Sequence, residues 1–252
     1  MSDKQQQTQF RSTNPIAQEI IDQLNKGERE ASNLMQVLAI DFRLLLKNTL
    51  PEFNCPELPR SLGITKKQKV ISAHLDQQFG FNIFDKLKSH KSDSLRSLAC
   101  YLVGEQPLSF KEKLSLIEPL ANDSNSGVRE WAWMAIRTDF AQNLVQNIKL
   151  LGVLTSNPLA NIRRFASELS RPRGVWCEHI TELKQSPWLG LSILEPLNSD
   201  DANYVQLSVG NWLNDAGKSH PEWVKDLCQG WARLSPTKNT EKICKRALRR
   251  LV

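Results

Sequence analysis

The sequence predicts an all-α fold built as a solenoid of paired helices. Apolar residues recur at helical spacing through most of the chain. Signals for a sheet are scarce, because the chain has only two tyrosines and no Asn-Gly or Asp-Gly hairpin turn. A short motif also returns from residue 90 onward at intervals of 33 and 34 residues, and such spacing is typical of helical repeats.

The elements before residue 90 follow from apolar spacing and from helix breakers. Residues 1–14 are polar and rich in glutamine, so we expect a disordered tail there. Apolar residues at helical spacing predict helices over 16–24 and 34–45. A loop with three prolines separates them from a third predicted helix at 66–79. Residues 15–252 are expected to form a single repeat domain.

The repeated motif consists of an apolar residue, Arg, any residue, an apolar residue and Ala. It stands at 95–99, 128–132 and 162–166; Gln206 replaces the Arg in a fourth copy, and 243–247 resembles a fifth. The copies share preceding turns rich in Asp, Asn and Ser, which favours true repeats over coincidental similarity among amphipathic helices. We therefore predict a superhelical solenoid of HEAT-like paired-helix repeats, whose extended concave surface suits an extended partner such as duplex nucleic acid.

Composition excludes several classes of protein. With 40% hydrophobic and 24% charged residues, the 252-residue chain is neither fibrous nor disordered. Its five cysteines stand singly, and it has no nucleotide-binding fingerprint or Ser-His-Asp set, so we expect no disulfide framework, no metal and no cofactor. No secretory signal and no membrane-spanning apolar run is present, so we expect a cytoplasmic protein of bacterial-type cytosol or nucleoid, without membrane association.

Positive charge points to an anionic partner and is concentrated near the end of the chain. The formal net charge is +6 and the pI is about 9.1. Residues 238–250 hold six basic side chains and one acidic side chain. This stretch is predicted to be a contact surface.

A first unusual segment concentrates arginines around one acid. Glu168 is accompanied by Arg163, Arg164, Arg171 and Arg173. On a helix, Arg164 and Glu168 are four residues apart and share a narrow sector of surface. The alternative is an ion pair on a solvated helix face.

A second unusual segment ends at Pro221. Asn211, Asp215 and Lys218 fall on one face near the end of a helix that this proline stops. Asn and Asp in the last helical turns go against propensity, and such exceptions are most frequent at functional sites. The alternative is that Asn214 and Asp215 only shape the end of the helix.

The repeat register also aligns polar residues of successive repeats. Arg137, Arg171 and Asn214 each lie eight residues after the motif arginine or its glutamine replacement. We therefore predict a line of polar side chains along one wall of the solenoid. Arginines in such a line suit phosphates, which they bind in bidentate fashion.

The two unusual segments resemble those of the AlkC-type DNA alkylation repair proteins, HEAT-like relatives of the AlkD glycosylases. Departures from the family pattern, such as Gly210 and Trp212, remove neither acid, and the chain has no all-β segment for the immunoglobulin-like domain that some relatives append. The likeness covers nearly the whole chain, and the segments that carry it are 24–28, 38–42, 128–137, 165–176 and 208–221.

The resemblance implies a monofunctional DNA glycosylase of base excision repair that hydrolyses the N-glycosidic bond of cationic N3-alkylated bases, such as 3-methyladenine and 3-methylcytosine. It implies that Glu168 and Asp215 are the catalytic carboxylates and that Trp176 contacts the lesion. A cationic base leaves as a neutral group without a general acid, so one carboxylate can stabilise the oxocarbenium-like sugar and the other can position water. We assign the sugar to Glu168 and the water to Asp215.

Indole faces attract cations, so Trp131, Trp133 and Trp212 are further candidates to contact a cationic base, with a core position as the alternative.

The predicted partner is double-stranded DNA containing alkylated bases, bound by a monomer. Two other functions remain possible alternatives. The protein could be a non-catalytic HEAT-repeat protein that recognises bent, branched or damaged DNA, or a protein-protein scaffold. The side chains predicted to contact DNA are Arg137, Arg163, Arg164, Arg171, Arg173, Asn211, Asn214, Lys218, Lys245, Arg246 and Arg249.

Overall fold

The computed structural model describes residues 15–59 and 61–251, so the predicted tail at 1–14 lies outside the described residues. The described residues contain no strand, and the all-α prediction is confirmed. The α-helices are α1 (Gln18–Asn25), α2 (Leu34–Ala39), α3 (Phe42–Thr49), α4 (Ile64–Phe79), α5 (Phe84–Lys88), α6 (Asp93–Glu105), α7 (Phe110–Ala121), α8 (Ser126–Ala135), α9 (Arg137–Gln142), α10 (Leu144–Val153), α11 (Ala160–Leu169), α12 (Thr181–Gln185), α13 (Leu191–Leu194), α14 (Asn203–Gly217), α15 (Pro221–Leu234) and α16 (Lys238–Leu248).

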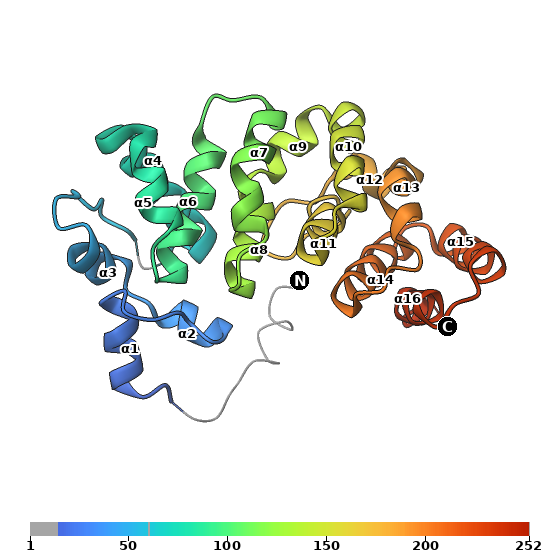
Figure 1. Cartoon of the computed structure of the whole chain (residues 1–252), viewed down its shortest axis with the longest axis horizontal. Coiled ribbons are helices and arrows are strands. Elements are labelled where there is room, and N and C mark those ends of the chain that lie inside the picture. Colours follow the sequence, from blue (N-terminus) through green and yellow to red (C-terminus); the bar gives the residue numbers. More distant parts are fainter. Residues whose placement is uncertain (1–14, 60, 252) are drawn as a thin grey trace.

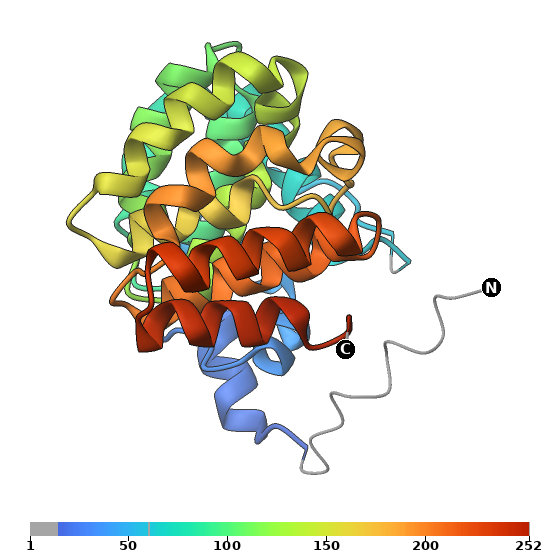
Figure 2. The same cartoon turned by 90° about the vertical axis from the view of Figure 1, so that its right-hand side faces the viewer.

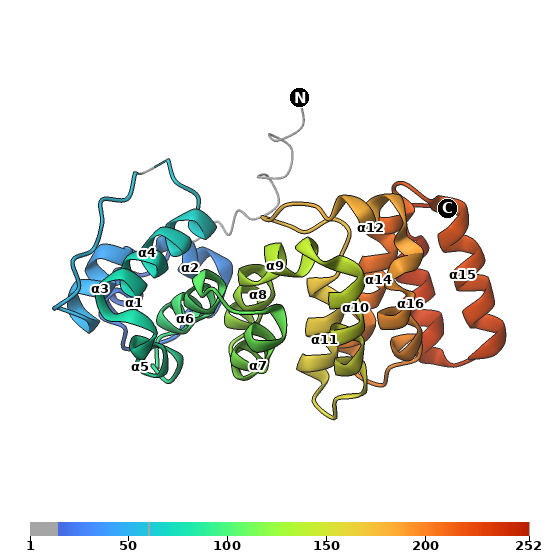
Figure 3. The same ribbon diagram turned by 90° about the horizontal axis from the view of Figure 1, so that it is seen from above.

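The chain advances from α1–α6 on the left to α14–α16 on the right of Figure 1, and its helices form two rows (Figures 1 and 3). In one row, α4, α6, α8, α11, α14 and α16 each pack against the next. The other row contains α5, α7, α10, α13 and α15. At the C-terminal end, α14, α15 and α16 lie side by side as orange and red rods (Figure 2). The predicted solenoid of paired helices is therefore confirmed.

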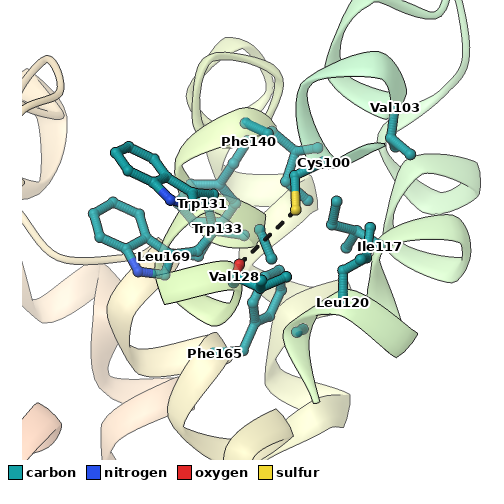
Figure 4. Close-up of a cluster of buried hydrophobic side chains, with 14 of the residues drawn as sticks. Cys100, Val103, Ile117, Leu120, Val128, Trp131, Trp133, Phe140, Phe165 and Leu169 are labelled. Carbon is teal, nitrogen blue, oxygen red and sulfur yellow. Dashed lines mark hydrogen bonds between the residues drawn. The ribbon is translucent and has the colours of Figure 1, made fainter. Parts of the chain in front are cut away.

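A continuous hydrophobic core lies between the rows. Figure 4 shows the part of it where Cys100 of α6, Ile117 of α7, Val128 of α8 and Phe165 of α11 meet. The thiol of Cys100 donates a hydrogen bond to the backbone oxygen of Val128 at 3.8 Å, which joins α6 to α8. Each repeat thus covers the apolar face of the next, as expected of a solenoid.

The motif arginine closes the turn before its helix. Its Nη1 atom donates to the two backbone carbonyls five and six residues earlier, which otherwise lack helical partners. Gln206, the replacement, donates from Nε2 to the carbonyl six residues before it at 2.8 Å. The arginine hydrogen bonds measure 2.6–3.1 Å and join Arg96 to the carbonyls of His90 and Lys91, Arg129 to those of Asp123 and Ser124, and Arg163 to those of Asn157 and Pro158.

Two predicted elements differ from the structure. The single helix predicted over 34–45 is divided into α2 and α3, because the Asp41 side chain accepts from the backbone N–H groups of Arg43 and Leu44 and starts a new helix. The fifth repeat copy is shifted. Since α16 begins at Lys238, the position equivalent to the motif arginine is Glu241 rather than Cys244, the second residue of 243–247.

The segment between α1 and α2 crosses the starts of α6 and α8. The backbone N–H of Ala31 donates to Asp93 at 3.1 Å, and the Asn125 side chain donates to Glu30 at 3.2 Å and to the carbonyl of Ala31 at 3.3 Å. Glu30 also pairs with Arg96. These contacts bring α2 close to the first turn of α8. Within the described part of the chain, no helix combines the length and hydrophobicity that a membrane span requires.

Candidate active site

Glu168 and Asp215 meet at one guanidinium. Nη1 of Arg171 lies 3.0 Å from Oε2 of Glu168, and Nη2 lies 2.6 Å from Oδ2 of Asp215. Glu168 stands at the end of α11 and Asp215 near the end of α14, the equivalent helices of neighbouring repeats. The two carboxyl side chains are nearly buried, with exposed fractions of 3% and 7%. Packing of adjacent repeats therefore brings together two acids that are far apart in the sequence.

The acids belong to a longer row in which acidic and basic side chains alternate, which we call the ion-pair ladder. It runs across α8, α11 and α14, so it crosses three repeats. Its consecutive N–O distances are 2.6, 3.4, 3.0, 2.6 and 2.9 Å, and its members in order are Glu130, Arg164, Glu168, Arg171, Asp215 and Lys218.

The buried arginines of the ladder remain charged. Burial lowers the pKa of the Arg171 guanidinium, but Glu168 and Asp215 outweigh it, and the pKa is raised above its ordinary value. Burial likewise lowers the pKa of Arg164, and the charges of Glu168 and Glu130 again produce a net rise. Each guanidinium is thus a fixed positive charge between two carboxyl groups.

The ladder borders a pocket of about 450 Å³ on the side of the solenoid that faces α2. Glu168, Arg164 and Arg171 line this pocket, whereas Asp215 lies behind Arg171 and does not. The remaining walls are mostly apolar or aromatic. They are formed by Ala31, Ser32, Asn33, Leu34, Val37, Asn125, Ser126, Gly127, Glu130, Trp131, Trp133, Met134, Val175, Trp176 and Asn211.

Trp176 is held at the pocket by a strained turn. Its backbone has φ of +63°, in the left-handed region that bulky residues rarely adopt. The side chain is 47% exposed, and its ring centroid lies 6.4 Å from that of Trp131. Two residues earlier, a Cβ on Gly174 would lie 2.0 Å from Sγ of Cys177, so this turn requires glycine there.

Arg137 and Asn214 occupy the predicted line of equivalent positions but serve a structural role. Arg137 is 3% exposed and donates at 2.6 Å to the carbonyls of Leu169 and Arg171 in the next repeat. Asn214 is 2% exposed and donates to the carbonyl of Ala247 at 2.9 Å. Their contact with DNA stays a prediction, and in this structure helix ends buried between repeats accept the hydrogen bonds of these donors.

Arg163, whose contact with DNA also stays a prediction, is engaged within the protein in a similar way. Besides two turn carbonyls, it contacts Asp200 at 2.6 Å and Asp201 at 3.1 Å. Its side chain is 14% exposed. The donors that were predicted to contact phosphates are thus engaged by groups of the protein itself.

The other predicted DNA contacts lie around the ladder and along α16. Arg173 donates to the backbone oxygen of Asp215 at 3.3 Å, and Lys218, which pairs with that carboxylate, is 40% exposed. The side-chain oxygen of Asn211, a pocket residue, accepts from Arg246 at 2.9 Å and from Arg249 at 3.2 Å. Lys245 is exposed on the same helix, α16.

Two parts of the pocket, Glu130 and the segment 31–37, were not predicted from the sequence. Glu130 stands within a segment that carries the family resemblance, which is the signal that could have identified it. The segment 31–37 gave no signal, because its place in the pocket depends on the path of the chain. Among the tryptophans, Trp212 is fully buried and donates to the carbonyl of Ser170 at 2.9 Å, which is the core alternative. Among the residues that the structure describes, no three His, Cys, Asp or Glu side chains form a metal-binding group.

No protein-family model matches the chain. Solved structures with a similar backbone include the alkylpurine DNA glycosylase AlkC of Pseudomonas fluorescens bound to DNA containing an abasic site analog, with a TM-score of 0.67 and 22% identity. They also include AlkD2 of Streptococcus mutans, with a TM-score of 0.62 and 19% identity. The chain has the AlkC and AlkD2 fold.

The extent of these matches differs. The AlkC match covers 93% of this chain but 63% of AlkC, and the AlkD2 match covers 83% of this chain and 99% of AlkD2. The smu.31 protein of Streptococcus mutans UA159 matches with a TM-score of 0.55 and 21% identity over 71% of the chain and 97% of that protein. A 92-residue stretch, 36% of the chain, is 42% identical to the uncharacterized protein YhaZ of Bacillus subtilis (strain 168) and spans 25% of YhaZ.

Proposed function

We propose that the chain is a DNA glycosylase of base excision repair that hydrolyses the N-glycosidic bond of cationic N3-alkylated bases, such as 3-methyladenine and 3-methylcytosine, in duplex DNA. The observation that carries this proposal is the pairing of Glu168 and Asp215 at Arg171, beside a pocket with a half-exposed tryptophan. The fold shared with AlkC, an alkylpurine DNA glycosylase, supports it.

In the proposed mechanism, the two acids act on the two reacting groups, the sugar and the attacking water. Cleavage of the N-glycosidic bond builds positive charge on the sugar, and a carboxylate close to the sugar stabilises that charge. Glu168 takes this role because it lines the pocket. Asp215 positions the attacking water and accepts the proton that the water loses when its oxygen bonds to the sugar carbon. The base leaves as a neutral molecule, so no proton donor is required.

Trp176 and the basic side chains supply binding. The exposed indole face of Trp176 attracts a positively charged base by cation–π interaction. Arg173 and Lys218 contact Asp215, and Arg246 and Arg249 contact Asn211 of the pocket. In the proposal these side chains, together with Arg164, Arg171 and Lys245, contact DNA phosphates. A phosphate that draws Arg164 or Arg171 away would leave Glu168 less neutralised and better able to stabilise the sugar.

We further propose that residues 15–252 form one domain that acts as a monomer in the cytoplasm. No step of the proposed reaction requires a cofactor or a metal. A cationic lesion is already activated for departure, so the protein needs only fixed charges and a bound water.

The deciding experiment measures release of base from duplex oligonucleotides that contain a single 3-methylcytosine or 3-methyladenine. We expect the wild-type chain to produce free base and alkali-labile abasic sites, and Glu168→Gln and Asp215→Asn to lose this activity while retaining the helical circular dichroism spectrum. Absence of release by the wild-type chain would overturn the function. Full activity in both variants would overturn the assigned roles.

One observation favours a second function, a non-catalytic protein that recognises bent, branched or damaged DNA. Both acids are already neutralised by Arg171, and Asp215 also pairs with Lys218, as in a purely structural network. This function predicts DNA binding that weakens steeply with salt, without any release of base.

A further inference from the structure

We propose that Glu130 is a substrate-contacting residue, whose carboxylate provides the negative face of the pocket for a planar organic cation. The proposal rests on the proposed function only for the identity of that cation, an alkylated base. The binding of a planar cation in this pocket is a separate property, and it can be tested without catalysis.

Charge balance along the ion-pair ladder distinguishes Glu130 from the other two acids. Glu168 lies between two guanidinium groups, Arg164 at 3.4 Å and Arg171 at 3.0 Å. Asp215 likewise lies between two cations. Glu130 stands at one end of the ladder, where Arg164 at 2.6 Å is its single cationic partner, and it shares that cation with Glu168. The ladder as a whole is neutral, with three acids and three bases, but Glu130 is the acid with the fewest cationic partners.

The exposed fractions of the three acidic side chains also distinguish Glu130 from the other two. The side chain of Glu130 is 33% exposed and lines the pocket, whereas those of Glu168 and Asp215 are 3% and 7% exposed. Water and ligands that enter the pocket thus reach Glu130 more readily than either of the other acids. A carboxylate in contact with a low-polarity wall acts on a nearby cation more strongly than one surrounded by water.

The carboxylate of Glu130 is oriented by its neighbours. Nε1 of Trp133 donates to Oε2 at 2.9 Å, and Nη2 of Arg164 donates to Oε1 at 2.6 Å. Arg164 is itself fixed over the ring of Tyr204, with 4.1 Å between its guanidinium carbon and the ring centroid. Each oxygen of the carboxylate accepts one hydrogen bond and retains a lone pair for a ligand. The group is thus held in place but not saturated.

Aromatic walls around this acid fit a planar cation. Trp131, Trp133 and Trp176 line the same pocket as Glu130, and Trp176 presents nearly half of its side chain to solvent. A cation beside a carboxylate and over an indole face is attracted both by the charge of the carboxylate and by the quadrupole of the indole ring. A neutral ring of the same shape is stabilised only by stacking. The volume of about 450 Å³ lies within the roughly 300–1,000 Å³ of small-molecule sites. Glu130 would thus select a charged base over a neutral one.

The test titrates the full chain at pH 7 with 3-methylcytidine, a cationic nucleoside, and with cytidine, its neutral parent, and follows quenching of tryptophan fluorescence. We expect the wild-type chain to bind 3-methylcytidine more tightly than cytidine by about tenfold. Glu130→Gln keeps the shape and the acceptor for Trp133 and should abolish this preference. Glu130→Asp should restore part of it.

Glu105→Gln serves as the matched control, because Glu105 is exposed on α6 and does not line the pocket. It should leave the preference unchanged. A wild-type chain without preference for the cation, or a Glu130→Gln variant that keeps the preference, would overturn the inference. The outcome is independent of base release. Preference without release would contradict only the proposed glycosylase, and release without preference would contradict only the role of Glu130.

Discussion

Arg163 and Arg164 are neighbours on α11 with nearly equal exposed fractions, 14% and 12%, yet they serve different structures. Arg163 binds the backbone carbonyls of the preceding turn and Asp200. Arg164 binds Glu130 and Glu168 at the pocket. Since successive residues on a helix point about 100° apart, adjacent arginines reach different sides of the repeat. Burial and charge alone therefore do not separate a structural arginine from a functional one.

The difference lies in the partners. Backbone carbonyls of a buried turn have no alternative donor, so an arginine bound to them is not free to leave. In the ion-pair ladder every partner is a side chain, and a charged ligand such as a phosphate can compete for the same guanidinium. The turns make the repeats stable, and the ladder provides charges that can be exchanged. The following predictions test this distinction.

The largest effect is expected at Asp215 of the ladder. Asp215→Asn keeps a hydrogen-bond acceptor for Arg171 but removes the charge, so base release should fall by about 10²- to 10⁴-fold with little change in stability. Single-turnover release and thermal unfolding measure the two quantities. Asp226→Asn, on an exposed position of α15, is the control and should change neither. A similar loss in both variants would show that the effect is not specific to the site.

The next largest effect concerns a turn arginine. Arg163→Ala leaves Asp200 and two turn carbonyls without their donor, so the free energy of unfolding should fall by about 3 kcal/mol. Base release per folded molecule should not change. Urea denaturation followed by circular dichroism, with release measured at a temperature where the variant is folded, tests both points. Unchanged stability with weakened DNA binding would place Arg163 among the DNA contacts.

A smaller effect is expected at the strained turn. Trp176→Asn places a residue that tolerates the left-handed region at φ of +63°, so the free energy of unfolding should change by less than about 1 kcal/mol. Binding of 3-methylcytidine should weaken by about tenfold because the indole face is lost. A loss of several kcal/mol in stability would instead identify Trp176 as a core residue.

The smallest effect concerns the exposed cations of α16. Lys245→Ala and Arg249→Ala should each reduce the slope of log binding constant against log salt by about 1, for any DNA sequence. Fluorescence anisotropy with a labelled duplex at several salt concentrations measures this slope. Lys149→Ala, on an exposed position of α10 in the other row, should leave the slope unchanged. An equal change in all three variants would place the contact surface elsewhere.

Sequence predicted the repeat architecture well because the motif is local. The turn residues, the motif arginine and the apolar positions lie within a few residues of one another, so their spacing reports the repeated unit directly. Local patterns did not reveal that Asp41 divides one predicted helix into α2 and α3. An aspartate between two apolar runs can cap a helix or lie on its solvated face. Only its contact with the next backbone N–H groups shows which of the two it does.

The site could be predicted in part. Arg164 and Arg171 flank Glu168 at helical spacing, so their association was accessible from sequence. The roles of Arg137 and Asn214 were not. Both were correctly placed at equivalent repeat positions, but the carbonyls that bind them belong to the next repeat. The partner of a buried donor is whichever acceptor the neighbouring helix leaves unpaired, and the local sequence does not show that acceptor.

The helical class, the repeat spacing and the arginines beside Glu168 follow from interactions between residues close together in the chain, and local sequence is sufficient for them. Packing between repeats decided the rest. It brought Asp215 to the guanidinium of Arg171, placed the segment 31–37 against the pocket and left Glu130 as the most exposed acid of the ladder. These features depend on which helix faces join, and hydrophobic burial over the whole solenoid determines that choice.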